Sequence, residues 1–145
     1  MPRNDNVRID TRMLDQIQRN LNQFSNQHIV VGLLGSAGSE IVMRGVYTEF
    51  GTSKMPAWRW LKRSVDIMTP QYKRHASQVF TSILNGRNPN YDVVGLWAKS
   101  QVQKFLADVT TPRLSWATIQ KKGSDKPLID TGQMGMSISY EVRND

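Results

Sequence analysis

The sequence has no cysteine and only two histidines, and this shortage limits the chemistry open to the protein. Without cysteine there is no disulfide framework, no thiol nucleophile and no thiolate metal site. His28 and His75 each lack a second ligand four residues away, which is the spacing of helical zinc motifs. Glu49 has no identifiable partner for acid–base work. We therefore expect no catalytic residue, no metal and no cofactor, and a protein that is not an enzyme.

Long hydrophobic runs are also missing. No stretch approaches the roughly 20 apolar residues that cross a membrane, and residues 1–6 lack the apolar core of a signal peptide. We expect no membrane partner and a location in the cytoplasm where the chain is made. With 145 residues, 39% hydrophobic and 21% charged, the chain suits one soluble domain. We predict a single domain over residues 1–145, with a flexible arm at 1–9 and a loop at 85–91.

A surplus of positive charge, +7 overall, is spread over several patches of the sequence. The densest patch is residues 58–63, Trp-Arg-Trp-Leu-Lys-Arg. Aromatic rings can stack on bases and cations can meet phosphates, so a nucleic-acid-binding module is an alternative function. On a helix, however, Trp58 and Trp60 point apart, and Trp60 is better placed in the core. Tryptophan and arginine are also enriched at protein interfaces, which we favour here.

Apolar spacing predicts a mixed α+β fold in which strands flank a helical centre. We expect a helix capped by Asp10 or Thr11 that buries one face through Phe24, and an interior strand at 28–34. Further helices are predicted at 39–50, which Gly51 would end in the left-handed cap conformation, at 58–68, from Thr69 and Pro70 onward, and at 94–109, with a single turn capped by Ser115. A half-buried antiparallel strand follows at 137–143. The architecture that fits is a small antiparallel or mixed sheet with several helices packed on one face.

The triplet Asp130, Thr131 and Gly132 is also the signature of the aspartic proteases, which pair two such aspartates. Only thirteen residues follow Gly132, enough for one strand, so the protease core cannot be built in its usual order. A protease is therefore the least favoured alternative. We interpret the triplet as a structural turn in which the Asp130 carboxylate accepts backbone N–H groups and Gly132 supplies an unusual dihedral angle.

Two segments in a fixed order carry a family resemblance. The first comprises a strand at 29–32, a helix that ends in 46–52 (Val-Tyr-Thr-Glu-Phe-Gly-Thr), and a turn at 55–57 (Met-Pro-Ala). The second comprises 126–134 (Lys-Pro-Leu-Ile-Asp-Thr-Gly-Gln-Met), preceded by Leu114, 118–119 and 121–122, and followed by 137–142. Together they resemble the small neck proteins of tailed bacteriophages, the head-tail joining and tail-completion family. Residues 58–60, Trp-Arg-Trp, depart from the Arg-Pro-Phe usual in that family.

The resemblance implies a non-enzymatic virion protein that forms a ring of six subunits in the phage neck, after assembly in the host cytoplasm. Its partners would be further copies of itself, the head-completion or connector protein, and the tail-tube or tail-terminator protein. The positive charge would meet acidic neighbours or DNA in the channel. A ring of identical subunits needs two different contact patches on each one. We expect Glu49, Phe50, Gly51, Thr52, Trp58 and Arg59 to supply such contacts.

Overall fold

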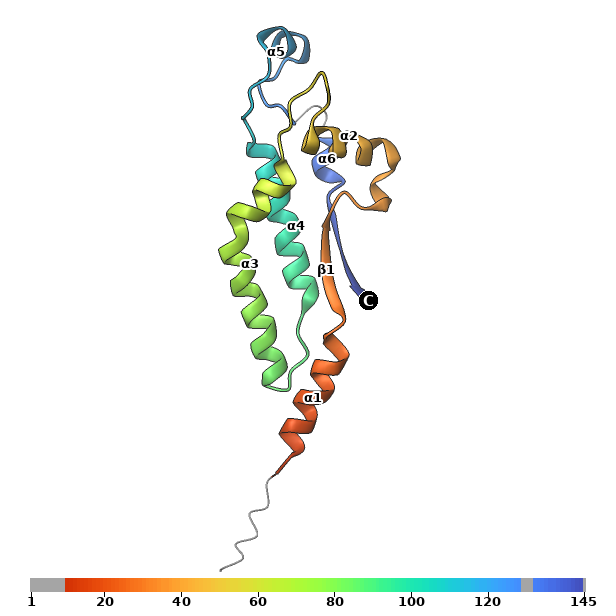
Figure 1. Cartoon of the computed structure of the whole chain (residues 1–145), viewed down its shortest axis with the longest axis vertical. Helices are drawn as coiled ribbons and strands as arrows, with labels where there is room; N and C mark the ends of the chain where they lie inside the picture. Colours follow the sequence, from red (N-terminus) through yellow and green to blue (C-terminus); the bar gives the residue numbers. More distant parts are fainter. Residues whose placement is uncertain (1–9, 129–131, 145) are drawn as a thin grey trace, which may run out of the picture.

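The computed structural model describes residues 10–128 and 132–144, and within them it confirms an α+β fold. The molecule is elongated, with the helix nearest the N-terminus at one end and a short helix at the other (Figure 1). The elements in chain order are α1 (Arg12–Phe24), β1 (Gln27–Gly32), the 3₁₀ helix η1 (Gly35–Ala37), α2 (Ser39–Phe50), α3 (Trp60–Leu84), α4 (Tyr91–Asp108), α5 (Trp116–Lys122), α6 (Gln133–Met136) and β2 (Ser139–Asn144).

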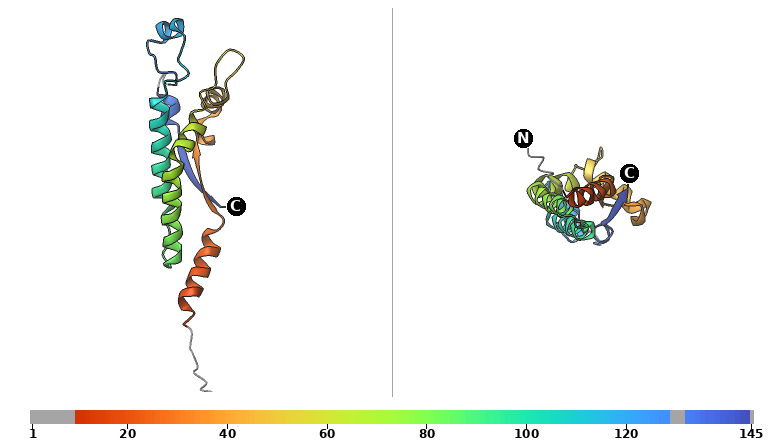
Figure 2. Two further views of the ribbon diagram at one scale, coloured as in Figure 1. Left: turned by 60° about the vertical axis from the view of Figure 1, so that its left-hand side comes forward. Right: turned by 90° about the horizontal axis from the view of Figure 1, so that it is seen from below.

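The sheet has two antiparallel strands, β1 and β2, with Val31 opposite Tyr140. Helix α4 contacts both strands, and α3 packs alongside α4 (Figure 2). Gly95 allows the close approach of α4 to the sheet, because a Cβ atom there would lie 2.2 Å from a ring carbon of Tyr140. Buried side chains from α4, α6, the start of α3 and the segments between these elements form the main core: Trp58, Trp60, Val102, Leu106, Val109, Leu128, Met134 and Ile138.

Several elements agree with the sequence predictions. Helix α2 has the predicted bounds, and the strand expected at 137–143 is β2. The loop expected at 85–91 covers residues 85–90, because Tyr91 already belongs to α4. The hydroxyl of Ser115 accepts a hydrogen bond from the backbone N–H of Thr118 at 3.3 Å, so the predicted cap of α5 is confirmed. The arm predicted at 1–9 lies outside the described residues.

Two predictions about the central helices are wrong. One helix, α3, runs through Pro70, where the sequence indicated a new start at Thr69. Proline removes one hydrogen-bond donor and its ring crowds the preceding turn, but α3 contacts α4 both before Pro70, through Arg63 on Phe105, and after it, through Tyr72 on Trp97. The Thr69 hydroxyl donates to the carbonyl of Val65 at 2.8 Å, as hydroxyls within helices do. The helix also begins at Trp60, not at residue 58, so Trp58 lies in the extended segment before it.

The strand predicted at 28–34 is present as β1, but the prediction of an interior position is wrong, because β1 has one hydrogen-bonded neighbour in the described sheet. Its apolar run is explained by helix α4, which packs against it. Helix α1 differs as well. Of its apolar residues only Phe24 is fully buried, whereas Met13 and Leu14 are each 60% exposed. The first half of α1 projects beyond the ends of α3 and α4 (Figure 1), so these two helices leave it uncovered.

Candidate assembly interface

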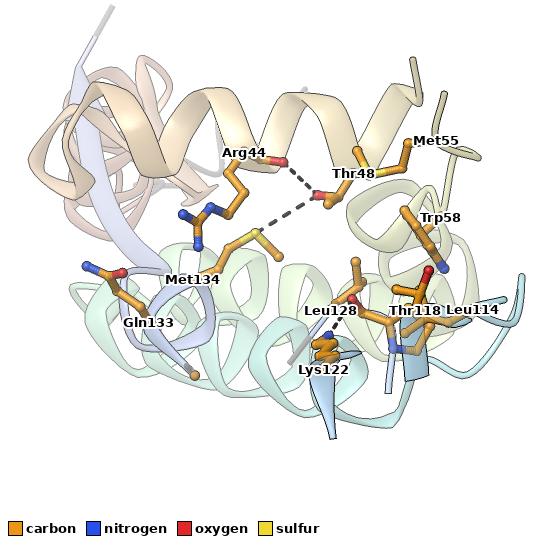
Figure 3. Close-up of a pocket in the computed structure, with 12 residues that line it drawn as sticks. Arg44, Thr48, Met55, Trp58, Leu114, Thr118, Lys122, Leu128, Gln133 and Met134 are labelled. Atoms are coloured by element: carbon orange, nitrogen blue, oxygen red, sulfur yellow. Dashed lines mark hydrogen bonds between the residues drawn. The ribbon is translucent and has the colours of Figure 1, made fainter. Parts of the chain in front are cut away.

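The two segments that carry the family resemblance lie side by side in the structure. The hydroxyl of Thr48 in α2 is 3.9 Å from the sulfur of Met134 in α6. Both residues line a pocket of about 240 Å³, with Trp58, Leu128 and the start of α6 among its other walls (Figure 3). Lys122 reaches this region from α5 and donates to the carbonyls of Lys126 and Pro127 at 2.8 and 3.0 Å. The two motifs therefore build one end of the molecule together.

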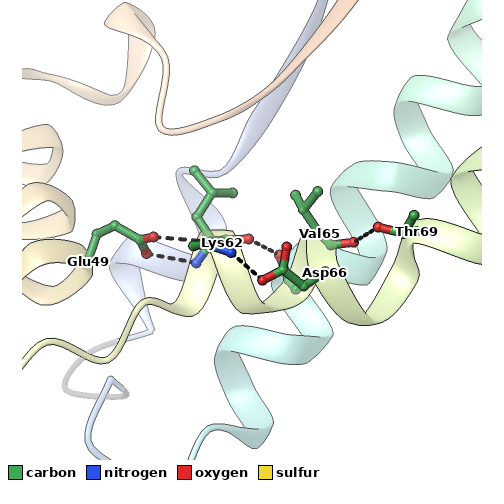
Figure 4. A network of polar contacts seen from close by, with 7 residues as sticks. Glu49, Lys62, Val65, Asp66 and Thr69 are labelled. Atoms are coloured by element: carbon green, nitrogen blue, oxygen red, sulfur yellow. Dashed lines mark hydrogen bonds and ion pairs between the residues drawn. The ribbon is translucent and has the colours of Figure 1, made fainter.

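Glu49 joins the end of α2 to the beginning of α3. Its side chain is buried, and its carboxylate oxygens accept hydrogen bonds from the backbone N–H groups of Leu61 and Lys62 at 2.8 and 3.1 Å (Figure 4). These N–H groups belong to the first turn of α3, where no helical carbonyl can pair with them. A negative charge is also favoured there by the helix dipole. Glu49 thus caps α3 from a different helix.

The turn after Glu49 is held in one shape by its backbone. Gly51 has φ 77° and ψ 176°, a conformation that only glycine adopts readily. A Cβ atom at Gly51 would lie 2.9 Å from the backbone nitrogen of Ala57. Thr52 and Met55 then exchange two backbone hydrogen bonds, at 2.8 and 3.3 Å. The positive φ predicted for Gly51 is confirmed, although its ψ is extended and not that of a left-handed helical cap.

Trp58 and Trp60 are both inside the molecule, with exposed fractions of 3% and 2%. The Trp58 indole N–H donates to the carbonyl of Pro112 at 2.8 Å, and the Trp60 indole N–H donates to the Thr48 hydroxyl at 3.1 Å. Neither ring is available for stacking on a base. Trp116 of α5, which is 73% exposed, has the free aromatic surface that we expected of residue 58.

The six residues expected at a subunit contact therefore divide into two groups. Glu49 and Trp58 use their side chains within the monomer, and Gly51 shapes the turn. Phe50, Thr52 and Arg59 have exposed side chains. Arg59 has φ 49° and ψ 40°, and its backbone N–H donates to the carbonyl of Glu49 at 3.2 Å, which fixes its position before α3. A partner would meet the second group.

Phe50 belongs to a row of exposed apolar side chains on α2, of which only Phe50 itself was predicted to make a subunit contact. Phe50 is 75% exposed, and the other members are between 41% and 46% exposed. We call this row the α2 stripe, and it consists of Met43, Val46, Tyr47 and Phe50. The spacing i, i+3, i+4 and i+7 places all four on one side of a helix. That spacing is the signal in the sequence, but it indicates an apolar helix face without saying whether the core or solvent lies against it.

The turn at the second motif is described only in part. Asp130 and Thr131 lie outside the described residues, so the role predicted for the Asp130 carboxylate stays a prediction. Gly132 is described, and its φ of 71° and ψ of −6° confirm the unusual dihedral angle predicted there. Its carbonyl accepts a hydrogen bond from the backbone N–H of Met136 at 3.0 Å, so Gly132 opens α6.

Reactive side chains are dispersed in the part of the chain that the structure describes. Within residues 10–128 and 132–144 no three His, Asp or Glu side chains are grouped as metal ligands. His75 packs against the ring of Trp97, with centroids 4.2 Å apart, and His28 is exposed on β1. The helices of the described residues include none with the length and apolar character of a membrane span.

Partial burial raises the pKa of three tyrosines, Tyr72, Tyr91 and Tyr140, above the ordinary value of 10.0. For Tyr140 the negative charge of Asp92 raises the pKa further, and the Tyr140 hydroxyl donates to that carboxylate at 3.2 Å. Each shift favours the neutral phenol. These tyrosines therefore act as packing and hydrogen-bonding groups at neutral pH.

Comparison of the chain with protein-family models, with curated proteins and with solved structures gives no match.

Proposed function

We propose that this protein is a non-enzymatic structural subunit of a tailed-bacteriophage virion, which forms a ring at the head-tail junction and joins tail to head. The observation that carries the proposal is the meeting of the two motif segments at Thr48 and Met134. Thr48 and Met134 are 86 residues apart in the chain, yet both line one pocket. Two motifs that resemble the same family and also pack together support a common origin better than either motif alone.

The surface of the monomer gives further support. The α2 stripe, Met13 and Leu14 of α1, and Trp116 of α5 all expose large apolar side chains on different elements. Exposed apolar patches of this kind mark surfaces that bind other proteins. A subunit of a closed ring needs two distinct patches of this kind, and a subunit between head and tail needs more.

The alternative of a nucleic-acid-binding module is less well supported, because its main argument was that Trp58 and Trp60 stack on bases, and both rings are buried. Positive charge remains on the surface, for example on the exposed side chains of Lys54, Arg59, Arg113 and Lys121. Such charge favours a negatively charged partner. In a neck ring that partner is either an acidic neighbouring protein or the DNA in the channel.

The experiment that tests the proposal uses purified protein and phage tails assembled without it. We expect the protein to bind such tails as a ring visible by electron microscopy, and to restore infectivity when heads are added. A protein that stays monomeric on its own and with tails, and restores no infectivity, would contradict the proposal. Tight DNA binding with a steep dependence on salt, without any ring, would favour the nucleic-acid alternative.

A further inference from the structure

A second apolar surface of the molecule is a groove between the sheet and the helices. We call it the β1–α3 groove, and it encloses about 420 Å³. Apolar side chains from β1, α3 and α4 form most of its wall, among them Ile29, Val31, Ala76, Phe80, Ile83 and Val94. Ala76 and Phe80 of α3 are exposed at its opening. The groove is thus an open apolar channel in the monomer.

The α2 stripe has the residue spacing of a helix that binds in such a groove. An amphipathic helix that binds in a hydrophobic groove uses anchor residues at i, i+3 or i+4, and i+7. Met43, Val46, Tyr47 and Phe50 have this spacing and project from α2 into solvent. The groove and the stripe are both apolar, and the described residues leave each of them uncovered. One chain therefore carries both halves of a helix-in-groove contact.

The two halves cannot meet within one molecule. The carboxylate of Glu49 fixes the end of α2 to Leu61 and Lys62 at the beginning of α3. Ala76 in the groove lies fifteen residues further along α3 than Leu61, which is about 20 Å at the rise of an α-helix. The stripe of one molecule can reach only the groove of another.

We infer that the α2 stripe of one copy of this chain binds in the β1–α3 groove of a second copy. The contact is heterologous, because each copy uses its stripe toward one neighbour and its groove toward the other. Such contacts repeat into rings or filaments. The inference rests on the proposed function in one respect, since it names the subunit contact of the proposed ring. Its test does not depend on phage tails.

The test uses two charged variants that damage opposite halves of the contact. Phe50→Glu places a charge in the stripe and leaves the groove intact, and Ala76→Glu does the reverse. Each variant alone should be monomeric by sedimentation velocity at concentrations where the wild-type chain assembles. An equimolar mixture should form a dimer and nothing larger, because only one intact stripe and one intact groove remain to pair. Met136→Glu, at an exposed residue outside both surfaces, is the matched control and should assemble like wild type.

A second measurement traps the contact directly. The chain has no cysteine, so introduced thiols are the only ones that can react. A short thiol-reactive cross-linker should join Val46→Cys to Ala76→Cys in a mixture of the two variants. It should join neither variant to itself, and it should not join Val46→Cys to Met136→Cys. Circular dichroism checks that every variant is folded.

Several outcomes would overturn the inference. Assembly that survives either glutamate variant would do so, as would a mixture that stays monomeric although wild type assembles. Cross-linking of Val46→Cys to itself would show a symmetric contact instead. A wild-type chain that remains monomeric at the highest soluble concentration and gives no Val46–Ala76 cross-link would also overturn it. If the mixing test succeeds but the protein fails to join tails, the contact stands and the proposed neck function falls.

Discussion

At the scale of single residues, the end of α2 holds three neighbouring side chains with different tasks. Thr48 accepts a hydrogen bond from Trp60 and contacts Met134, so it ties the two motifs together. Glu49 caps α3, and Phe50 points into solvent. Three consecutive positions on a helix point in directions about 100° apart. The same short motif therefore serves the core, the start of a second helix and the outer surface.

Replacement of Glu49 by glutamine should destabilise the monomer. The amide nitrogen of glutamine cannot accept a hydrogen bond, so one of the two backbone N–H groups at the start of α3 would lose its partner. We expect the free energy of unfolding to fall by about 1–3 kcal/mol, measured by urea denaturation. Glu40→Gln is the control, because Glu40 lies on the surface in an exposed pair with Arg44, and it should change stability by less than about 1 kcal/mol. Equal effects of the two substitutions would contradict the capping role.

Replacement of Gly51 by alanine should cost more than the same change at Gly123. Both glycines have positive φ, 77° and 72°, but only Gly51 has backbone atoms within about 3 Å of the added Cβ position. We expect Gly123→Ala to lower the free energy of unfolding by about 1–2 kcal/mol from the left-handed conformation alone. Gly51→Ala should cost at least about 3 kcal/mol because strain and overlap add. Thermal or urea unfolding compares the two, and a smaller loss for Gly51→Ala would show that the turn can relax.

At the scale of elements, neighbouring helices bury very different amounts of their apolar surface. Helix α4 is enclosed between α3 and the sheet, and it buries Gly95, Ala98, Val102 and Leu106. Helix α2 is attached at its C-terminal end and exposes its stripe. Helix α5 buries no residue at all. Since packing of an apolar face supplies most of the stability of a helix in a protein, α2 and α5 gain less stability from the described monomer than α4 does.

Replacement of Pro70 by alanine should stabilise the protein. Pro70 is exposed inside α3 and cannot donate the hydrogen bond that a helical residue normally makes. Alanine would restore that donor and has the higher helix propensity, so the free energy of unfolding should rise by about 1–3 kcal/mol in urea denaturation. Gln71→Ala, at the next exposed position, should change it by no more than about 0.5 kcal/mol. Loss of stability in Pro70→Ala would indicate that the packing of α3 on α4 requires a bend at the proline.

At the scale of the whole molecule, the described part of the chain is long and narrow, and exposed apolar side chains are distributed along its length. Helices α1, α2 and α5, which carry exposed large apolar side chains, lie at separate places along an elongated shape (Figure 1). A small elongated domain buries less of its surface than a compact one. We expect such a molecule to gain much of its order from neighbours in an assembly.

High pH should weaken the folded state through its tyrosines. The folded protein raises the pKa of Tyr140 above 10.0 by burial and by the charge of Asp92. The stabilisation from the neutral phenol is therefore complete below pH 10 and is lost as pH rises through the folded pKa, because the unfolded chain ionises first. Urea denaturation across this range should show decreasing stability. Tyr140→Phe should show a shallower decrease, and an unchanged slope in that variant would contradict the role of this side chain.

The sequence by itself determined the helical centre, the closing strand, the Ser115 cap and the positive φ of Gly51 and Gly132, because capping, turn chemistry and apolar period act over a few residues. It also placed Glu49 and Phe50 in a motif of interest. It could not show the direction of each side chain. The apolar period of α2 is the same whether the stripe faces a core or solvent. In the sequence Pro70 predicts the start of a helix, and only the packing of α4 against α3 on both sides of Pro70 shows that the helix continues. Only the tertiary structure decided that Trp58 is buried, that Glu49 caps α3 and that the stripe is exposed, since each depends on which distant segments meet.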